Sequence, residues 1–202
     1  MLRGMTIFTI PRALDWGGLD VPLFGLTKDL RGAPLDPPAG FSLVADPQYL
    51  WFMASHRRPA RLHPQAKPGI FQSGLWNHDV AELFITNPRG RYLEFNLSPN
   101  GAWWTCEFTA PRVRAEVEDI VMPEIATFSE IAPDGSWLAA MAIPLDILRA
   151  RVDFGPDTRA NVTMILESPA QRFISACDLG NGPADFHQPS KFPTASFVPI
   201  PE

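Results

Sequence analysis

An all-β fold, in which two antiparallel sheets form a jelly-roll-like sandwich with one short helix, is what this sequence predicts. Proline and glycine account for 22 and 14 of the 202 residues, and such frequent interruption argues against long helices. About ten short runs of aromatic and β-branched residues lie between these interruptions, which is typical of β-sandwiches. A closed barrel is the structural alternative.

The composition excludes several classes of protein. A hydrophobic fraction of 46% rules out intrinsic disorder, and a net charge of −5 argues against a nucleic-acid partner. No apolar run approaches the roughly 20 residues of a membrane span, and the first residues lack the pattern of a signal peptide, so we expect a cytoplasmic protein with no membrane partner. Cys106 and Cys177 lack the spacing of a zinc or redox motif, and free buried thiols are expected.

The first part of the chain is rich in proline. The length allows one core, so we expect residues 1–202 to form a single domain, with residues 1–44 as an N-terminal extension packed on it. The proline-rich stretches Ala33–Gly40 and Arg57–Gly69 are predicted to be loops. Between them, the aromatic run Tyr49–Ala54 is typical of a core strand.

A three-stranded antiparallel meander is predicted over residues 80–108. Its strands are Val80–Ile85, Tyr92–Leu97 and Ala102–Phe108, each rich in aromatic and branched residues. Asn100-Gly101 favours a two-residue type I′ turn between the last two strands, because both positions of that turn need positive φ.

This turn sets a register by counting. It places Leu97 opposite Trp104, and it places Glu94 directly opposite Glu107. One face of the meander is then apolar: Leu83, Ile85, Leu93, Phe95, Leu97, Trp104, Cys106 and Phe108. The other face combines carboxylates, an amide, hydroxyls and aromatic rings: Glu82, Phe84, Tyr92, Glu94, Asn96, Trp103, Thr105 and Glu107. Large aromatic rings are unusual on a purely solvated face, so we expect a ligand there. The alternative is that Trp76 and Trp103 are packing residues and that the carboxylates pair with arginines: Arg91, Arg112 or Arg114.

Turn residues also mark the elements that follow. Pro133-Asp134-Gly135 predicts a hairpin between strands Ile125–Ile131 and Ser136–Ile143. Pro144 suits the first position of a helix of one or two turns. The remaining predicted strands are Ala160–Glu167, Arg172–Cys177 and Ser196–Ile200.

Four segments together resemble a known family. They are Leu75–Phe84, Tyr92–Gly101, Trp137–Pro144 and Asp185–Phe192, which resemble the successive signatures of family 9 carbohydrate-binding modules within the DOMON-like superfamily. The likeness extends over residues 45–200. It implies a two-sheet sandwich that grips the end of a sugar chain on a concave face, between two Trp rings.

The resemblance also implies roles for single residues. Trp76 and Glu82 match the family's first Trp and a sugar-contacting acid, and Asn96 matches a polar position on the neighbouring strand. Where the family has its second Trp, this chain offers only Phe173. With the two face residues Glu94 and Trp103, the predicted carbohydrate site comprises Trp76, Glu82, Glu94, Asn96, Trp103 and Phe173.

Several alternatives remain open at this point. An acid pair suits a glycosidase, although we expect a non-enzymatic protein. Glu94 and Glu107 could hold a structural calcium ion, and an arginine between them is the favoured alternative. DOMON-like relatives include haem-binding cytochromes, in which an axial Met together with a His or a Lys holds the haem. The candidates for these axial ligands are Met53, Met141, Met164, His56, His187 and Lys191. A module that has kept the fold but binds a protein partner, or a second copy of itself, is the last alternative.

Overall fold

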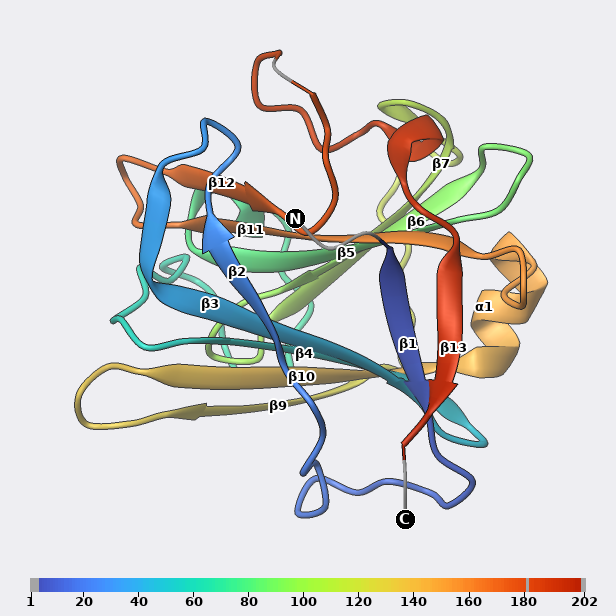
Figure 1. Ribbon diagram of the computed structural model, residues 1–202, viewed down its shortest axis with the longest axis horizontal. Helices are drawn as coiled ribbons and strands as arrows, with labels where there is room; N and C mark the ends of the chain where they lie inside the picture. The colour runs from blue at the N-terminus through green and yellow to red at the C-terminus, as the bar shows by residue number, and fades with distance from the viewer. Residues whose placement is uncertain (1–3, 181, 201–202) are drawn as a thin grey trace.

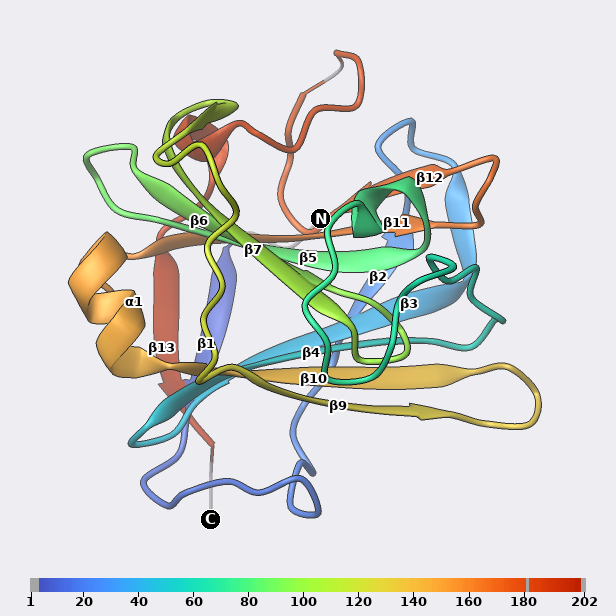
Figure 2. The ribbon, with the colours of Figure 1, turned by 180° about the vertical axis from the view of Figure 1, so that it is seen from behind.

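Two β-sheets pack face to face in the computed structural model, which describes residues 4–180 and 182–200 (Figures 1 and 2). One sheet has the order β13–β1–β3–β4–β10–β9 with β2 beside β3: β1 (Met5–Thr9), β2 (Phe24–Lys28), β3 (Pro34–Ala45), β4 (Tyr49–His56), β9 (Ala126–Ile131), β10 (Trp137–Pro144) and β13 (Ala195–Pro199). The other has the order β12–β11–β5–β6–β7–β8: β5 (Val80–Thr86), β6 (Tyr92–Leu97), β7 (Trp103–Ala110), β8 (Val113–Arg114), β11 (Arg159–Leu166) and β12 (Arg172–Ser175). The predicted sandwich is confirmed.

Helical structure in the described part of the chain is short. It comprises η1 (Leu75–Asn77), α1 (Leu145–Val152) and η2 (Pro189–Lys191). Helix α1 begins directly after Pro144 and lasts two turns, and it buries Leu148 and Val152 against one end of the sandwich. None of the described helices is long and apolar enough to cross a membrane.

The first sheet incorporates the N-terminal residues. β1 pairs in parallel with both β13 and β3, and β2 pairs antiparallel with β3. The segment before residue 45, expected to be an extension packed on the sandwich, thus supplies three strands of one sheet. The parallel pairing of β1 with β13 brings the first and the last strand of the chain side by side (Figure 1).

The prediction of a loop at Ala33–Gly40 is wrong, because β3 runs through it from Pro34. β4 pairs with β3 only from Gly40 onward, so the proline-containing half of β3 has β2 as its one neighbour. A register shift between Leu26 and Lys28 of β2 accompanies it. Proline is tolerated at such an edge with a bulge, since few backbone N–H donors are needed there.

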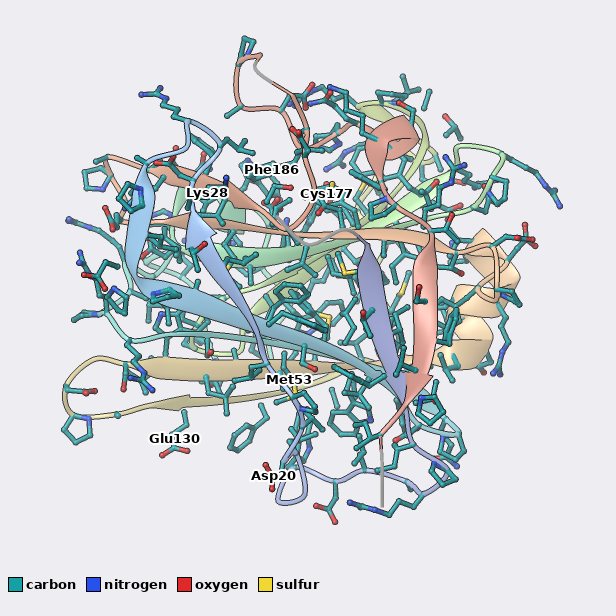
Figure 3. All side chains as sticks on the ribbon, viewed as in Figure 1. Asp20, Lys28, Met53, Glu130, Cys177 and Phe186 are labelled. Carbon is teal, nitrogen blue, oxygen red and sulfur yellow. The ribbon has the colours of Figure 1, made fainter. Side chains whose placement is uncertain are left out.

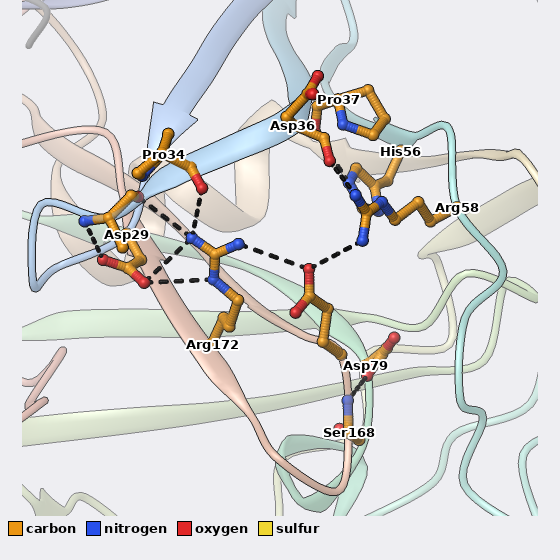
Figure 4. A network of polar contacts seen from close by, with 11 residues as sticks. Asp29, Pro34, Asp36, Pro37, His56, Arg58, Asp79, Ser168 and Arg172 are labelled. Carbon is orange, nitrogen blue, oxygen red and sulfur yellow. Dashed lines mark hydrogen bonds and ion pairs between the residues drawn. The ribbon is translucent and has the colours of Figure 1, made fainter.

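A network of ion pairs holds this edge of the first sheet to the second (Figure 4). The Arg172 guanidinium at the start of β12 lies 3.1 Å from the Asp29 carboxylate in the β2–β3 turn, and it donates to the carbonyl of Pro34 at 2.9 Å. Nearby, Asp79 accepts a hydrogen bond from the Ser168 N–H at 2.8 Å, which joins the start of β5 to the β11–β12 turn. The network thereby positions the strand ends that carry the functional residues described below.

The turn between β6 and β7 differs from the predicted type I′ turn. The Ser98 N–H donates to the Ala102 carbonyl at 2.8 Å, and the Gly101 N–H donates to the Ser98 carbonyl at 2.8 Å. Only Gly101 has positive φ, +81°. The loop therefore contains three residues, Pro99 to Gly101, in the form of a tight turn that ends in a left-handed glycine.

One extra loop residue shifts the predicted register by one. Leu97 lies opposite Trp103, not Trp104, and Glu94 lies opposite Cys106, not Glu107. Because side chains alternate between faces, the shift turns every β7 side chain to the other side of the sheet. Trp103 joins the core between the sheets, where its ring centroid is 5.0 Å from that of Phe71. The β7 side chains on the outer face are those that had been placed inside: Trp104, Cys106 and Phe108.

The other predicted elements are confirmed. Pro133-Asp134-Gly135 closes the β9–β10 hairpin, with the Ala132 N–H donating to the Ser136 carbonyl at 2.8 Å. Strands β4, β11, β12 and β13 lie where the sequence predicted them, as do the paired Glu82 and Asn96 on β5 and β6. Cys106 and Cys177 are free and buried, as expected.

Candidate functional site

A cavity of about 480 Å³ lies on the outer face of the second sheet, and we refer to it as the outer cavity. Its apolar lining consists mainly of aromatic rings: Trp76, Trp104, Phe108, Phe173 and Phe186. Its polar lining is dense in charge: Glu82, Glu94, Arg112, Arg114, Gln171 and His187. The volume falls in the range of about 300–1,000 Å³ that is usual for small-molecule sites. A second cavity of about 390 Å³, beside the β2–β3 turn, has no aromatic lining residue.

Strands of the second sheet, the short helix η1 and a loop build the outer cavity. β5, β6, β7 and β11 form its floor, η1 brings Trp76 to one side, and β12 brings Phe173. The segment of residues 182–192 passes over the face of the sheet and adds Phe186 and His187 (Figure 1). Residues distant in sequence therefore meet on one face.

A row of side chains crosses the floor of the outer cavity. Antiparallel pairing places Thr163 beside Glu82, Glu82 beside Asn96, and Asn96 beside Trp104. We call these four residues the cross-strand row. Glu94 lies on the same face of β6, two residues before Asn96, so it is a diagonal neighbour of Glu82.

Both glutamates are nearly inaccessible to solvent. Glu82 is 3% exposed and accepts one hydrogen bond, from the Thr163 hydroxyl at 2.9 Å. Burial raises the pKa of Glu82 well above its ordinary value, and the neighbouring charge of Glu94 raises it further. Glu94 is 5% exposed and accepts from the Asn96 amide at 3.0 Å. Burial raises the pKa of Glu94 to about 7.

The His187 side chain lies beside Glu94, and its ring is neutral. Burial lowers the pKa of His187 to about 4, and the nearby Arg112 lowers it further. The Tyr92 hydroxyl accepts the Arg112 backbone N–H at 3.1 Å, so it is free to donate to His187 Nδ1 at 2.8 Å. That bond leaves the ring proton on Nε2, which faces Glu94 Oε2 at 3.7 Å.

The aromatic walls hold one another in place. The ring centroids of Trp76 and Trp104 are 4.8 Å apart in an edge-to-face arrangement, and those of Phe173 and Phe186 are 5.9 Å apart. Trp76 is half-buried, so part of its ring stays accessible, whereas Trp104 is 2% exposed. Rings fixed in this way offer rigid apolar surfaces to a ligand.

The predicted carbohydrate-site residues occupy three kinds of position. Trp76, Glu82, Glu94 and Phe173 all line the outer cavity. Asn96 is fully buried in the cross-strand row, behind the lining. Trp103 was placed on this face in error, because the register shift turns it into the core and puts Trp104 in its place.

The sequence did not assign the other lining residues to the carbohydrate site, although Arg112 and Arg114 were considered as partners of its carboxylates. Gln171, Arg112 and Arg114 belong to loops or to the short edge strand β8, where alternation gives no signal. Phe186 lies in the segment Asp185–Phe192, whose resemblance to a family signature was the one available indication.

The predicted pairing of Glu94 with Glu107 is also wrong. Glu107 lies on the inner face of β7, at the end of the sandwich closed by α1, where it pairs with Arg91 and, at 2.7 Å, with Arg151. Arginine side chains do neutralise Glu107, but Glu94 lies on the opposite face of the sheet and does not contact them. The two glutamates therefore cannot bind one calcium ion together, and no cluster of three or more His, Cys, Asp or Glu in the described residues could hold a metal ion.

The side chains suggested for haem do not meet. Met141 and Met164 are buried between the sheets, while Met53 lies on the outer face of the first sheet, away from Phe186 (Figure 3). His187 lines the outer cavity, and Lys191 donates to the Leu179 carbonyl above the second sheet. An axial pair of Met with His or Lys would need residues from one face.

The remaining haem candidate, His56, lies in the first sheet. Its ring Nε2 is within hydrogen-bond distance, 3.2 Å, of the Pro37 carbonyl of β3. Burial lowers the pKa of His56, so its role in the structure is that of a neutral ring in a strand contact.

Comparison with known proteins places the fold. No protein-family profile and no curated protein sequence matches the chain. Among solved structures, a "putative carbohydrate-binding protein" from Bacteroides uniformis matches with a TM-score of 0.70 and 15% identity, over 95% of this chain and 99% of that one. A family 9 carbohydrate-binding module from Caldicellulosiruptor kristjanssonii in complex with cellotriose matches with a TM-score of 0.61 and 16% identity, over 98% and 95%.

A structure of a family 9 module from the same organism in complex with glucose matches with a TM-score of 0.60 and 14% identity, over 98% of each chain. At these identities the likeness establishes the fold. The chain has the β-sandwich fold of family 9 carbohydrate-binding modules over nearly its whole length, which confirms the implied fold and includes N-terminal residues that lay outside the resemblance.

Proposed function

We propose that this protein binds a saccharide or glycoconjugate in the outer cavity. The observation that carries the proposal is the composition of that cavity, in which rigid aromatic rings surround buried carboxylates on one face of the sandwich. The shared fold supports the proposal, because modules with this fold have been solved in complex with cellotriose and with glucose. Fold alone does not assign a ligand, so the chemistry of the cavity has to carry the assignment.

The lining suits the two surfaces of a sugar ring. The C–H face of a pyranose is apolar and packs on an aromatic plane, for which the accessible part of Trp76 is available. Sugar hydroxyls are both donors and acceptors, and the Glu82 and Glu94 carboxyls with the Gln171 amide offer planar partners. We expect modest affinity, because hydrogen bonds to water are exchanged for similar bonds in the cavity.

We further propose that the protein binds sugar without cleaving it. Glycoside hydrolysis needs one carboxyl that is protonated and a second that is ionised at the same pH. Burial raises the pKa of both Glu82 and Glu94, which does not by itself exclude such a pair, so the proposal rests on the kind of protein that shares this fold. The related solved structures are binding modules. Incubation with oligosaccharides, followed by chromatography for shortened products, tests this point, and any turnover contradicts it.

Calorimetric titration with cello-oligosaccharides and other β-linked trisaccharides tests binding itself. We expect saturable binding by the wild-type protein, and a loss of about tenfold or more in Trp76→Ala, which removes the accessible ring. Trp16→Ala is the matched control, because Trp16 is also half-buried but packs on Phe128 and Trp51 of the first sheet. Equal loss in both variants, or binding that survives Trp76→Ala, contradicts the proposed site.

A further inference from the structure

The two glutamates of the outer cavity lack a cationic partner. Of the residues that the structure describes, no Lys or Arg places a nitrogen within 4.0 Å of either carboxylate, and the His187 ring that faces Glu94 is neutral. Buried acids elsewhere in the protein are treated differently, since Glu107 pairs with two arginines. Unpaired buried carboxylates are costly, so such a pair is not expected to form a stable core by itself.

The arginines on the rim of the outer cavity are already engaged. Arg112 lies 2.8 Å from the Asp185 carboxylate, and Arg114 lies 2.8 Å from that of Asp119. The Arg114 guanidinium also lies 5.5 Å from the centre of the Trp104 ring. With both arginines paired to acids of their own, the charge left without a partner in the cavity is negative.

A second observation, which does not depend on charge, is that groups of the cross-strand row lack hydrogen-bond partners. The Trp104 indole N–H has no acceptor among the described residues, although Trp104 is 2% exposed and lines the outer cavity. Asn96 Oδ1, directly across from Glu82, likewise has no donor. Glu82 has a single bond, to one of its two oxygens. Buried polar groups are nearly always satisfied, so the two members of the row that line the cavity, Glu82 and Trp104, point to a ligand that brings both donors and an acceptor.

We propose that the preferred ligand is a saccharide with a free, protonated amino group, whose ammonium lies between Glu82 and Glu94 in the outer cavity. An ammonium has three N–H donors and a positive charge, which matches two carboxylates with spare acceptor sites. A neighbouring sugar hydroxyl then accepts the Trp104 N–H. Aromatic walls favour a cation further, since ring faces attract positive charge. The inference rests on the proposed function and specifies its ligand class.

Proton linkage supports the same ligand. In the empty cavity, burial keeps a proton on this pair near neutral pH, with the pKa of Glu94 at about 7. The other groups facing the pair are the neutral His187 and Tyr92 and two arginines that are paired with acids of their own, Arg112 and Arg114. A bound ammonium supplies the positive charge that this proton supplied, so its binding releases the proton from the carboxyl pair. Binding of a neutral sugar does not require that release.

Three trisaccharides of matched length test the proposal: the β-1,4 trimer of glucosamine, that of N-acetylglucosamine, and cellotriose. By calorimetry at pH 7 and low salt, we expect the glucosamine trimer to bind at least about tenfold more tightly than either neutral trimer. One charge-assisted hydrogen bond accounts for a difference in affinity of this size. Raising the salt concentration should weaken only the glucosamine trimer. Titrations in two buffers of different ionisation enthalpy should show proton release with that ligand.

Two variants locate the preference. In Glu94→Gln and in Glu82→Gln, the ratio of glucosamine-trimer affinity to cellotriose affinity should fall to near one. Glu130→Gln is the control, since Glu130 is exposed on the far side of the sandwich from Phe186 (Figure 3), and its ratio should match wild type. Should a variant fail to fold, the salt and proton measurements on wild type decide.

The outcomes separate the two proposals. If cellotriose binds as tightly as the glucosamine trimer, with no salt dependence for either, the amino-sugar inference is overturned while saccharide binding stands. If no trisaccharide binds, the proposed function fails, and the inference fails with it. A preference for the glucosamine trimer that persists in both glutamine variants also overturns the inference, because it places the ammonium elsewhere.

Discussion

The outer faces of the two sheets bury their carboxylates to the same extent, with opposite consequences. On the first sheet, Asp46 is 4% exposed and accepts four hydrogen bonds, from the backbone N–H groups of Leu14, Gln48 and Tyr49 and from the Trp51 indole. Burial alone would raise its pKa, but these donors together lower it. On the second sheet, Glu82 and Glu94 are as buried, have one clear donor each, and have raised pKa values.

This difference separates a structural acid from the two acids that we propose bind a ligand. Asp46 holds the segment before β2 on the first sheet, where the Trp16 ring packs on that of Trp51. The second sheet keeps a cavity above its acids. Burial by itself therefore does not identify a functional carboxylate, whereas burial without partners does.

The largest expected effect is loss of the structural acid. Asp46→Ala leaves four donors unpaired, so we expect the free energy of unfolding to fall by about 3–5 kcal/mol. Glu82→Gln, equally buried, should change it by less than about 1 kcal/mol, because the amide keeps an acceptor for the Thr163 hydroxyl, the one hydrogen-bond partner of Glu82. Urea denaturation of both variants measures the two losses in the free energy of unfolding. Equal losses would contradict the contrast between Asp46 and Glu82.

The adjacent tryptophans of β7 sharpen the comparison between core and cavity. Trp103→Phe should cost about 2 kcal/mol of stability, since Trp103 is packed between the sheets and its indole donates to the Gly69 carbonyl at 3.3 Å. Trp104→Phe should cost less stability but weaken saccharide binding, because its ring lines the outer cavity. Thermal melting and calorimetry on each variant test this assignment. The reverse pattern would restore the register predicted from sequence.

The dependence of stability on pH tests the unpaired state of Glu94. Its pKa of about 7 in the folded protein exceeds its ordinary value of 4.5, so the folded state binds more protons between these limits. The contribution of Glu94 is therefore present at low pH and is lost as pH rises from about 4.5 to 7, by roughly 3 kcal/mol. Subtracting the unfolding curve of Glu94→Gln isolates this loss, because other acids, such as Asp46, are common to both proteins. A flat difference would mean that Glu94 is paired.

The smallest expected effect concerns the turn that sets the register. Gly101→Ala should cost about 1 kcal/mol, because φ is +81° and the new Cβ would lie 3.1 Å from the Ser129 hydroxyl. Denaturation measures it, with Gly25→Ala as control, since Gly25 has open space for a Cβ and no positive φ. A loss in the control as large as in Gly101→Ala would show that turn strain is not the cause.

The strand segments of this fold were predictable from sequence, since aromatic and branched runs end at turn residues such as Asn100-Gly101 and Pro133-Asp134-Gly135. The register of β7 was not. Asn-Gly fits both a two-residue and a three-residue loop, and consecutive Trp103 and Trp104 make both faces of β7 apolar. Hydrophobic alternation therefore could not choose between the two registers.

Half of the candidate site followed from sequence. Glu82 and Asn96 could be paired by counting along a meander whose first two strands keep their register. The lining residues Arg112, Gln171 and Phe186 could not be placed, because loops that fold over a sheet leave no periodic signal. The β3 strand was missed for a related reason, since its pairing with β2 at an edge permits the prolines that argue for a loop.

The indole N–H signals in a ¹H–¹⁵N spectrum test the central claim most directly. Trp51 and Trp103 donate to Asp46 and to the Gly69 carbonyl, whereas the Trp104 N–H has no acceptor among the described residues. With signals assigned from single Trp→Phe variants, titration with the glucosamine trimer and with cellotriose should shift the Trp104 signal and leave the Trp51 signal in place. A saccharide that shifts Trp51 and not Trp104, or no shift with any saccharide, would contradict binding in the outer cavity.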